Sequence, residues 1–157
     1  KWKKGDVIEL NLPMQARLVK ANENLKSDIG KVAVERGPLV YCAEWVDNNG
    51  KASNIVMPTN ARFTSEFKSD LLNGVEVLKT TAPVIEIGKD GMSVATVNKP
   101  VTLIPYYAWA NRGDGEMMIW LSCNKGMSSS ITGALFTNIG ALKISARSYT
   151  ILAPASL

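Results

Sequence analysis

The chain has 157 residues, the length of one ordinary domain, and a formal net charge of +4. Its 46% hydrophobic and 20% charged residues are typical of a globular domain, not of a disordered chain. The densest basic cluster is only KWKK at residues 1–4, which argues against a nucleic-acid-binding face. The sequence contains no run of about 18 apolar residues and no targeting signal, so we predict no membrane segment and assign no localisation.

Histidine is absent from the whole sequence. Because histidine is the usual general base near neutral pH and the commonest metal ligand, this chain cannot build a Ser-His-Asp triad or an imidazole zinc site. The two cysteines, Cys42 and Cys123, lack C-x-x-C spacing and stand in apolar stretches. This context favours buried thiols over a disulfide or a functional thiol. We predict that the chain itself holds no metal and no cofactor.

Hydrophobic and polar residues alternate through the first part of the chain, as in half-buried strands. Residues 6–13 place three aliphatic side chains on one face, and residues 15–21 are predicted to form the next strand. A polar stretch follows, and residues 31–35 resume the alternation. We therefore expect three successive strands here.

The sequence ERGPLVYCAE, at residues 35–44, places two charges before an apolar run. Gly37 permits unusual φ angles and Pro38 fixes φ, so one strand is predicted to end here before the chain re-enters the sheet as a central strand. Glu35 and Arg36 would point to opposite faces, where each needs water or a charged partner. We interpret Glu35, Arg36, Gly37 and Pro38 as structural residues, not as a ligand site.

Residues 62–74 depart from the alternation. Phe63, Phe67 and Leu71 are four residues apart, and Asn73-Gly74 is typical of a helix end. This spacing predicts one short helix or helical turn.

The rest of the chain again has the composition of strands separated by turns. The predicted strands are residues 75–80, 82–88, 92–97, 101–110, 116–123 and 141–152. The strands on either side of the glycine-rich turn at 111–115 are expected to form a hairpin. Many short strands with frequent turns predict an all-β fold, namely an antiparallel, jelly-roll-like β-sandwich with at most one short helix.

Residues 106–120 combine aromatic rings with polar and charged side chains, as sugar-binding sites do. The candidate carbohydrate-binding residues are Tyr107, Trp109, Asn111 and Arg112, although aromatic residues in strands more commonly pack in the core or at an interface. Asp114 and Glu116 are too close in sequence to form a designed hydrolytic carboxylate pair. The tripeptide RGD at 112–114 matches an integrin-type motif, but Gly and Asp are also normal turn residues.

Four segments together resemble the C-terminal portion of glycoside hydrolase family 127, the β-L-arabinofuranosidase-like family. They are KWKKGDVIELNLPMQARLV, GKVAVERGPLVYCAE, DLLNGVEVL and LIPYYAWANRGDGEMMIWL. Their order and spacing fit over residues 2–121, whereas residues 122–157 lie outside any matching motif.

The resemblance implies an α/α barrel catalytic domain followed by β-sandwich domains. In such a protein a cysteine nucleophile on a zinc site, with a glutamate as acid/base, carries out retaining hydrolysis of L-arabinofuranosides. Those residues belong to the barrel, which we expect upstream of Lys1. No catalytic role carries over to Cys42 or Cys123, and zinc is expected only in the barrel.

We therefore interpret residues 1–157 as one non-catalytic β-sandwich module of such a glycosidase. It would brace its own catalytic barrel or mediate contacts in a homodimer. An alternative is a carbohydrate-binding module that holds a plant or microbial glycan through exposed aromatic residues, and a weaker one is an adhesion-type domain using RGD. The parent protein would be periplasmic or extracellular, with no nucleic-acid or membrane partner. Exposure of Tyr107 and Trp109 would separate the first two functions.

Substitution of Arg36 by alanine is expected to lower the melting temperature. The change would leave a carboxylate or carbonyl without its partner, at a cost of about 1–3 kcal/mol in the free energy of unfolding. Thermal unfolding of Arg36→Ala measures this cost. An unchanged melting temperature would instead indicate an arginine that faces solvent or a ligand.

Overall fold

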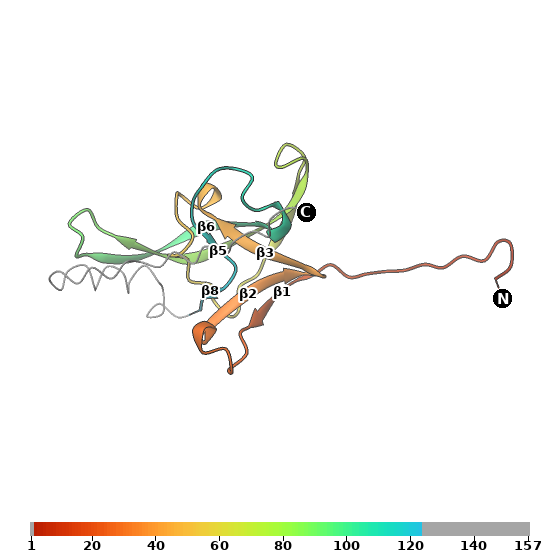
Figure 1. The fold of residues 1–157 in the computed structure, drawn as a ribbon, viewed down its shortest axis with the longest axis horizontal. Coiled ribbons are helices and arrows are strands. Elements are labelled where there is room, and N and C mark those ends of the chain that lie inside the picture. The colour runs from red at the N-terminus through yellow and green to blue at the C-terminus, as the bar shows by residue number, and fades with distance from the viewer. Residues whose placement is uncertain (1, 124–157) are drawn as a thin grey trace, which may run out of the picture.

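The computed structural model describes residues 2–123, and the regular structure of this part is all β (Figure 1). The strands are β1 (Ala16–Lys20), β2 (Lys31–Arg36), β3 (Leu39–Glu44), β4 (Thr64–Lys68), β5 (Val75–Ile87), β6 (Val94–Pro105), β7 (Met117–Met118) and β8 (Leu121–Ser122). Three short 3-10 turns are η1 (Lys26–Asp28), η2 (Trp45–Asp47) and η3 (Tyr106–Ala108). These strands pair antiparallel, so the predicted fold class is confirmed and is consistent with a β-sandwich. Within residues 2–123, no helix is long and apolar enough to cross a membrane.

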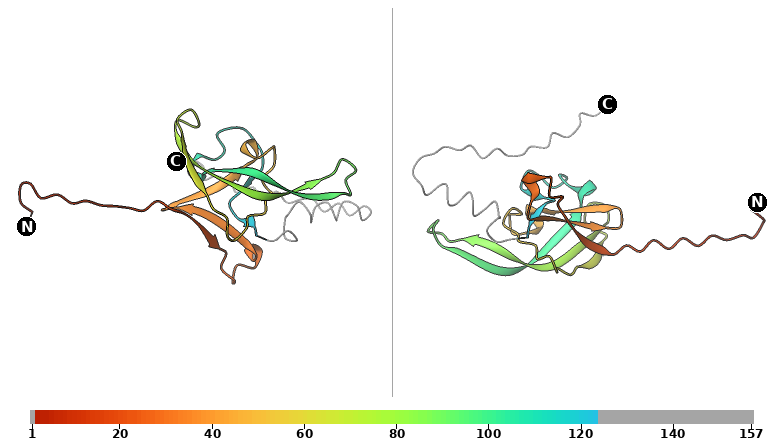
Figure 2. Two further views of the ribbon diagram at one scale, coloured as in Figure 1. Left: turned by 180° about the vertical axis from the view of Figure 1, so that it is seen from behind. Right: turned by 90° about the horizontal axis from the view of Figure 1, so that it is seen from below.

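The sheet has two halves that join along a short seam. Its strand order is β1-β2-β3-β6-β5-β4, with β7 beside β3 and β8 beside β2. The seam between β3 and β6 consists of the pairs Tyr41 with Pro105 and Cys42 with Ile104. In contrast, β5 and β6 pair along most of their length and project as a long two-stranded arm (Figures 1 and 2). Because only this short seam joins them, the two halves of the sheet need not lie in one continuous plane.

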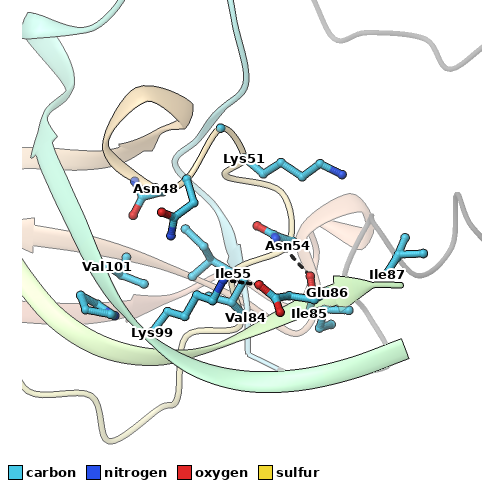
Figure 3. Close-up of a pocket in the computed structure, with 13 residues that line it drawn as sticks. Asn48, Lys51, Asn54, Ile55, Val84, Ile85, Glu86, Ile87, Lys99 and Val101 are labelled. Atoms are coloured by element: carbon cyan, nitrogen blue, oxygen red, sulfur yellow. Dashed lines mark hydrogen bonds and ion pairs between the residues drawn. The ribbon is translucent and has the colours of Figure 1, made fainter. Parts of the chain in front are cut away.

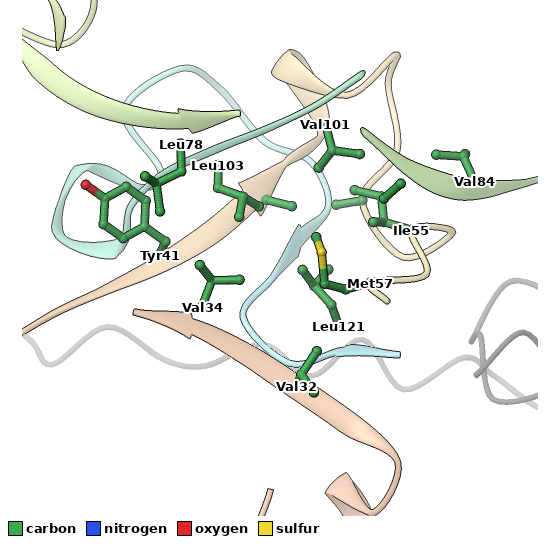
Figure 4. Close-up of a cluster of buried hydrophobic side chains, with 13 residues drawn as sticks. Val32, Val34, Tyr41, Ile55, Met57, Leu78, Val84, Val101, Leu103 and Leu121 are labelled. Atoms are coloured by element: carbon green, nitrogen blue, oxygen red, sulfur yellow. The ribbon is translucent and has the colours of Figure 1, made fainter. Parts of the chain in front are cut away.

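The main apolar cluster lies between the two halves, and its side chains point toward one another from β2, β3, β5, β6 and β8 (Figure 4). Its largest fully buried members are Val32, Val34, Tyr41, Ile55, Met57, Leu78, Leu103 and Leu121. Full burial of one such aliphatic side chain contributes about 1.5–3 kcal/mol. Tyr41 is tolerated in this cluster because its hydroxyl donates a hydrogen bond of 3.0 Å to the backbone oxygen of Glu76.

The stretch that precedes β3 is a tight hairpin. β2 ends at Arg36, β3 begins at Leu39, and these two residues are paired. Gly37 has a φ of +58°, which together with a following proline fits a two-residue turn of type II′.

The two charges before this hairpin lie on different sides of β2. Glu35 accepts a 2.9 Å hydrogen bond from Arg17 on β1. The guanidinium of Arg36 lies 3.6 Å from the carboxylate of Glu76 on β5. Both charged side chains therefore have a charged neighbour.

Residues 6–13 do not form the predicted strand. Figures 1 and 2 show the segment running away from the sheet as an extended chain. Its aliphatic side chains are largely exposed: Val7 88%, Ile8 69%, Leu10 76% and Leu12 66%. The alternation alone cannot make a strand, because a strand also needs a neighbouring backbone, and the described residues provide none here.

The helix predicted at residues 62–74 is also wrong, because this region contains β4. β4 pairs with the first half of β5, and the connecting turn contains Leu72, Asn73 and Gly74, all with positive φ. Asn73-Gly74 therefore makes a hairpin turn and not a helix end. Pairing with β5 overrides the four-residue spacing of the apolar side chains, and Phe67 remains 63% exposed.

The hairpin predicted across residues 101–123 is wrong as well. β6 ends at Pro105, and Tyr107 lies in the turn η3 instead of in a strand. β7 pairs with β3 and β8 pairs with β2, so neither returns to β6. The predicted strands at 75–80 and 82–88 merge into β5, and those at 92–97 and 101–110 merge into β6 up to Pro105. The strand predicted at 141–152 lies outside the described residues.

Candidate functional site

The loop at residues 106–116 carries the aromatic and polar residues that the sequence singled out. It leaves the sheet at the end of β6 and returns beside the end of β3, where β7 pairs with Ala43 and Glu44. The backbone N–H of Trp45 donates a 2.9 Å hydrogen bond to the oxygen of Glu116 and closes the loop. Ala110 has a φ of +67°, which marks a sharp turn at the middle of the loop.

A buried ion network holds this loop against the sheet. The side chain of Glu44 is only 2% exposed, and it accepts a hydrogen bond of 3.0 Å from Arg112 Nε and another from Arg112 Nη2. Arg112 also donates through Nη1 to Asp47 Oδ1 at 2.8 Å. The other carboxylate oxygen of Glu44 accepts the backbone N–H of Ala110 at 3.1 Å. The hydrogen bonds to Asp47 raise the pKa of Arg112 above its usual value, and those to Glu44 add a smaller increase.

Cys42 lies in the sheet close to this network. Burial raises the pKa of its thiol from 9.0 to about 12, and the negative charge of Glu44 adds to the increase. Both Cys42 and Cys123 are free thiols, as predicted; Cys42 is buried, whereas Cys123 is only partly buried. A buried thiol with a raised pKa is a poor nucleophile at neutral pH.

Two further polar side chains fix the neighbouring loop at residues 48–54. The buried amide of Asn48 donates to the oxygen of Glu44 at 2.8 Å and accepts the N–H of Thr102 at 3.1 Å. The Glu116 carboxylate accepts three hydrogen bonds, from the N–H of Ala52 and from the N–H and hydroxyl of Ser53. Desolvation disfavours the charged form of Glu116, but these hydrogen bonds outweigh it and lower the pKa of this carboxyl.

The four candidate carbohydrate-binding residues have different surroundings. Tyr107 is 67% exposed. Trp109 is half-buried, and its ring stacks on that of Tyr106 at 6.0 Å between centroids and 9° between planes. The amide nitrogen of Asn111 donates to the oxygens of Ala108 and Trp109, and the donors of Arg112 serve the ion network. Of the four, Tyr107 and Asn111 are exposed and Trp109 is partly exposed, whereas the guanidinium of Arg112 is engaged by two carboxylates.

Trp109 lines a groove that the sequence did not indicate, which we call the indole groove. Its lining residues are Asp28, Lys31, Trp109, Gly115, Met117, Met118, Ile119 and Trp120, and its volume is about 310 Å³. Pairing of β8 with β2 brings residues near 120 beside Lys31. Sequence reasoning noticed the aromatic stretch at residues 106–120 but did not name Trp120 as a candidate. It missed Lys31 and Asp28, because no local pattern connects them with residues that lie about eighty to ninety positions away.

A second hollow lies on the arm formed by β5 and β6, with a volume of about 330 Å³ (Figure 3). Its wall carries Asn48, Lys51 and Asn54 on one side and the Lys99–Glu86 ion pair on the other. The amide nitrogen of Asn54 donates to the oxygen of Ile85 at 3.1 Å. The buried amide oxygen of Asn54 has no hydrogen-bond partner among residues 2–123, and almost no solvent reaches it. A ligand in this hollow could therefore bond that oxygen only after the side chain moved.

Removal of the Arg112 side chain is expected to destabilise the chain strongly. Arg112→Ala would leave the buried Glu44 carboxylate without its charged partner, which costs about 3–5 kcal/mol in the free energy of unfolding. Arg17→Ala is the matched control, because the Arg17–Glu35 pair is exposed and such pairs are worth at most about 1 kcal/mol. Urea unfolding of both variants measures the difference. Equal losses would contradict the interpretation of Glu44–Arg112–Asp47 as a buried structural network.

Comparison with known proteins identifies the group of enzymes to which this chain is related. The model of the glycoside hydrolase family 127 C-terminal domain matches residues 16–122. A non-reducing end β-L-arabinofuranosidase of Bifidobacterium longum subsp. longum is 40% identical over 129 residues, which cover 74% of this chain and 20% of that protein.

Solved structures give the same result. The GH127 β-arabinofuranosidase BT3674 superposes with a TM-score of 0.76 and 44% identity, over 82% of this chain and 20% of that one. Ara127N-Se, a GH127 β-L-arabinofuranosidase from Geobacillus stearothermophilus T6, gives 0.62 and 38% identity, over 70% of this chain and 18% of that one. The chain thus spans about a fifth of the length of these relatives. It belongs to glycoside hydrolase family 127, and residues 16–122 correspond to the C-terminal domain of that family.

Proposed function

We propose that this chain is a non-catalytic β-sandwich module of a β-L-arabinofuranosidase and that it braces the catalytic barrel of that enzyme. The observation that carries the bracing role is the exposed apolar segment at residues 7–12. The match to a C-terminal domain, over about a fifth of the length of larger enzymes, supports a role as one part of such an enzyme.

The segment at residues 7–12 exposes several large hydrophobic side chains next to one another. Four aliphatic side chains within six residues are 66–88% exposed. Contiguous exposed apolar surface usually marks a place of contact with another protein surface. Full burial of each of these side chains would contribute about 1.5–3 kcal/mol, so a barrel that covered the segment would be held firmly to this module.

The residues of this chain do not fit the zinc site that the family resemblance implies. Among residues 2–123, no group of three His, Cys, Asp or Glu side chains could hold a metal ion. Cys42 is buried, and its thiol pKa of about 12 keeps it protonated at neutral pH, whereas a zinc ligand must be a thiolate. We therefore propose no catalytic step on these residues and assign the zinc to the barrel.

The bracing role is tested by a chimera in which this chain replaces the matching C-terminal portion of the Bifidobacterium longum enzyme. The double variant Ile8→Asp/Leu10→Asp is expected to lower the melting temperature of the chimera, because each substitution places a charge in an apolar contact worth about 1.5–3 kcal/mol. Arabinofuranosidase activity after mild heating should fall with it.

Two controls make this outcome specific. Glu9→Gln/Asn11→Asp changes the intervening polar positions of the same segment and should leave the chimera unchanged. In the isolated 157-residue chain, Ile8→Asp/Leu10→Asp should have little effect, since both side chains lie in solvent there. A chimera that tolerates Ile8→Asp/Leu10→Asp without loss of stability would exclude this segment as the bracing contact.

The state of Cys42 gives a separate prediction, in the alkaline range. The thiol pKa is about 12 in the folded chain and 9.0 ordinarily, so the unfolded chain loses its proton first as the pH rises. The free energy of unfolding should therefore fall above pH 9, by about 1 kcal/mol between pH 9 and 10. Urea unfolding across this range should show the fall in Cys123→Ala and a smaller one in Cys42→Ala. Identical curves for the two variants would mean that Cys42 ionises in the folded state, as a reactive thiol would.

A further inference from the structure

The indole groove has an apolar wall whose geometry is fixed. The ring of Trp109 is held by stacking on Tyr106, and Arg112, three residues further on, is tied to Glu44 and Asp47. Trp120 stands between β7 and β8, which are paired with β3 and β2 respectively. All five large apolar side chains of the wall are partly buried and keep some exposed surface: Trp109, Met117, Met118, Ile119 and Trp120. The wall therefore offers aromatic and thioether surface to a ligand without rearrangement.

The rim of the same groove carries hydrogen-bonding groups that residues 2–123 engage only in part. Lys31 Nζ donates one hydrogen bond of 2.9 Å to Asp28 Oδ1, and the two side chains are 24% and 21% exposed. Among the residues that the structure describes, this carboxylate is the only hydrogen-bond acceptor recorded for the ammonium, which has three N–H groups. The second oxygen of Asp28 has only a long contact of 3.4 Å with the Ser27 hydroxyl. The rim can thus donate and accept hydrogen bonds at one place.

The groove combines an apolar wall with a rim formed by the Lys31–Asp28 ion pair, and this combination favours some classes of ligand over others. A purely apolar partner would strip water from the Lys31–Asp28 pair without replacing its hydrogen bonds, which is unfavourable. An anion or a cation would meet a rim whose charges already cancel. A protein surface needs about 1,000 Å² or more for a specific interface, and a groove of about 310 Å³ lies at the low end of small-ligand pockets.

We propose that the indole groove binds one residue of a neutral glycan. The sugar places its C–H face on the rings of Trp109 and Trp120, and its hydroxyl groups bond to Lys31 and Asp28. Such hydroxyl groups both donate and accept, so they match the two charges of the rim at once. Of the four candidate residues named from the sequence, only Trp109 lines this groove. The choice of arabinosyl ligands as the first probes rests on the proposed function, whereas the groove itself does not.

The test is calorimetric titration of the 157-residue chain with arabino-oligosaccharides, and in parallel with xylo- and gluco-oligosaccharides of equal length. Trp120→Ala is expected to weaken binding about tenfold, the loss that corresponds to one aromatic contact. Lys31→Gln and Asp28→Asn keep the side-chain size and should each weaken binding at least threefold. Phe67→Ala is the matched control, because this exposed ring on β4 lies outside the groove lining, and it should bind as the parent chain does.

The remaining outcomes are each decisive. Absence of heat with all three oligosaccharide classes at millimolar concentration overturns the proposal, as does equal affinity of the parent chain, Lys31→Gln and Asp28→Asn. The latter two variants serve if Trp120→Ala fails to fold, which its melting curve shows. Binding of xylo- or gluco-oligosaccharides alone, lost in Lys31→Gln, supports the groove as a glycan site and counts against an arabinosyl ligand. The bracing role is decided by the chimera and is unaffected by any of these results.

Discussion

The contact between Glu44 and Arg112 is the interaction on which the rest of this structure depends. It joins the end of β3 to a loop sixty-eight positions later, and Asp47 accepts further hydrogen bonds from the same guanidinium. An arginine fork that binds two carboxylates satisfies charges that would be too costly to bury alone. The loop at 106–116 is fixed by this contact, and with it the rings of Tyr106 and Trp109. The Glu44–Arg112 ion pair thus helps to fix the position of Trp109, and through it one wall of the indole groove.

Much of the sheet could be predicted from local pattern. The alternation in residues 15–21 and 31–35, and the apolar run after Pro38, correspond to β1, β2 and β3. The predictions for these segments are correct because each strand pairs with a neighbour that is close to it in sequence. The turn at residues 89–91 was predicted for a similar reason, since it joins two strands that pair directly.

The rest of the fold depends on contacts that no short window of sequence contains. Residues 62–74 have helical spacing, yet pairing with β5 makes Thr64–Lys68 a strand. Residues 6–13 alternate well but remain exposed because no described strand lies beside them. For the site, the aromatic residues could be noticed from the sequence, whereas the engagement of Arg112 by Glu44 and the position of Lys31 beside Trp120 follow from pairing over long separations. Sequence reasoning thus found the loop but not the surface that it forms.

β3 changes its pairing partner along its length, so the correct alignment of this strand determines where Glu44 lies. One edge of β3 pairs with β6 at Tyr41 and Cys42 and then with β7 at Ala43 and Glu44. Side chains of a strand alternate between faces, so a slip of one residue would turn Glu44 to the opposite face and separate it from Arg112. A misaligned isomer would therefore bury an uncompensated charge. The acid at the end of β3 thus adds an electrostatic penalty against a one-residue slip to the penalty that the hydrophobic pattern of the strand already imposes.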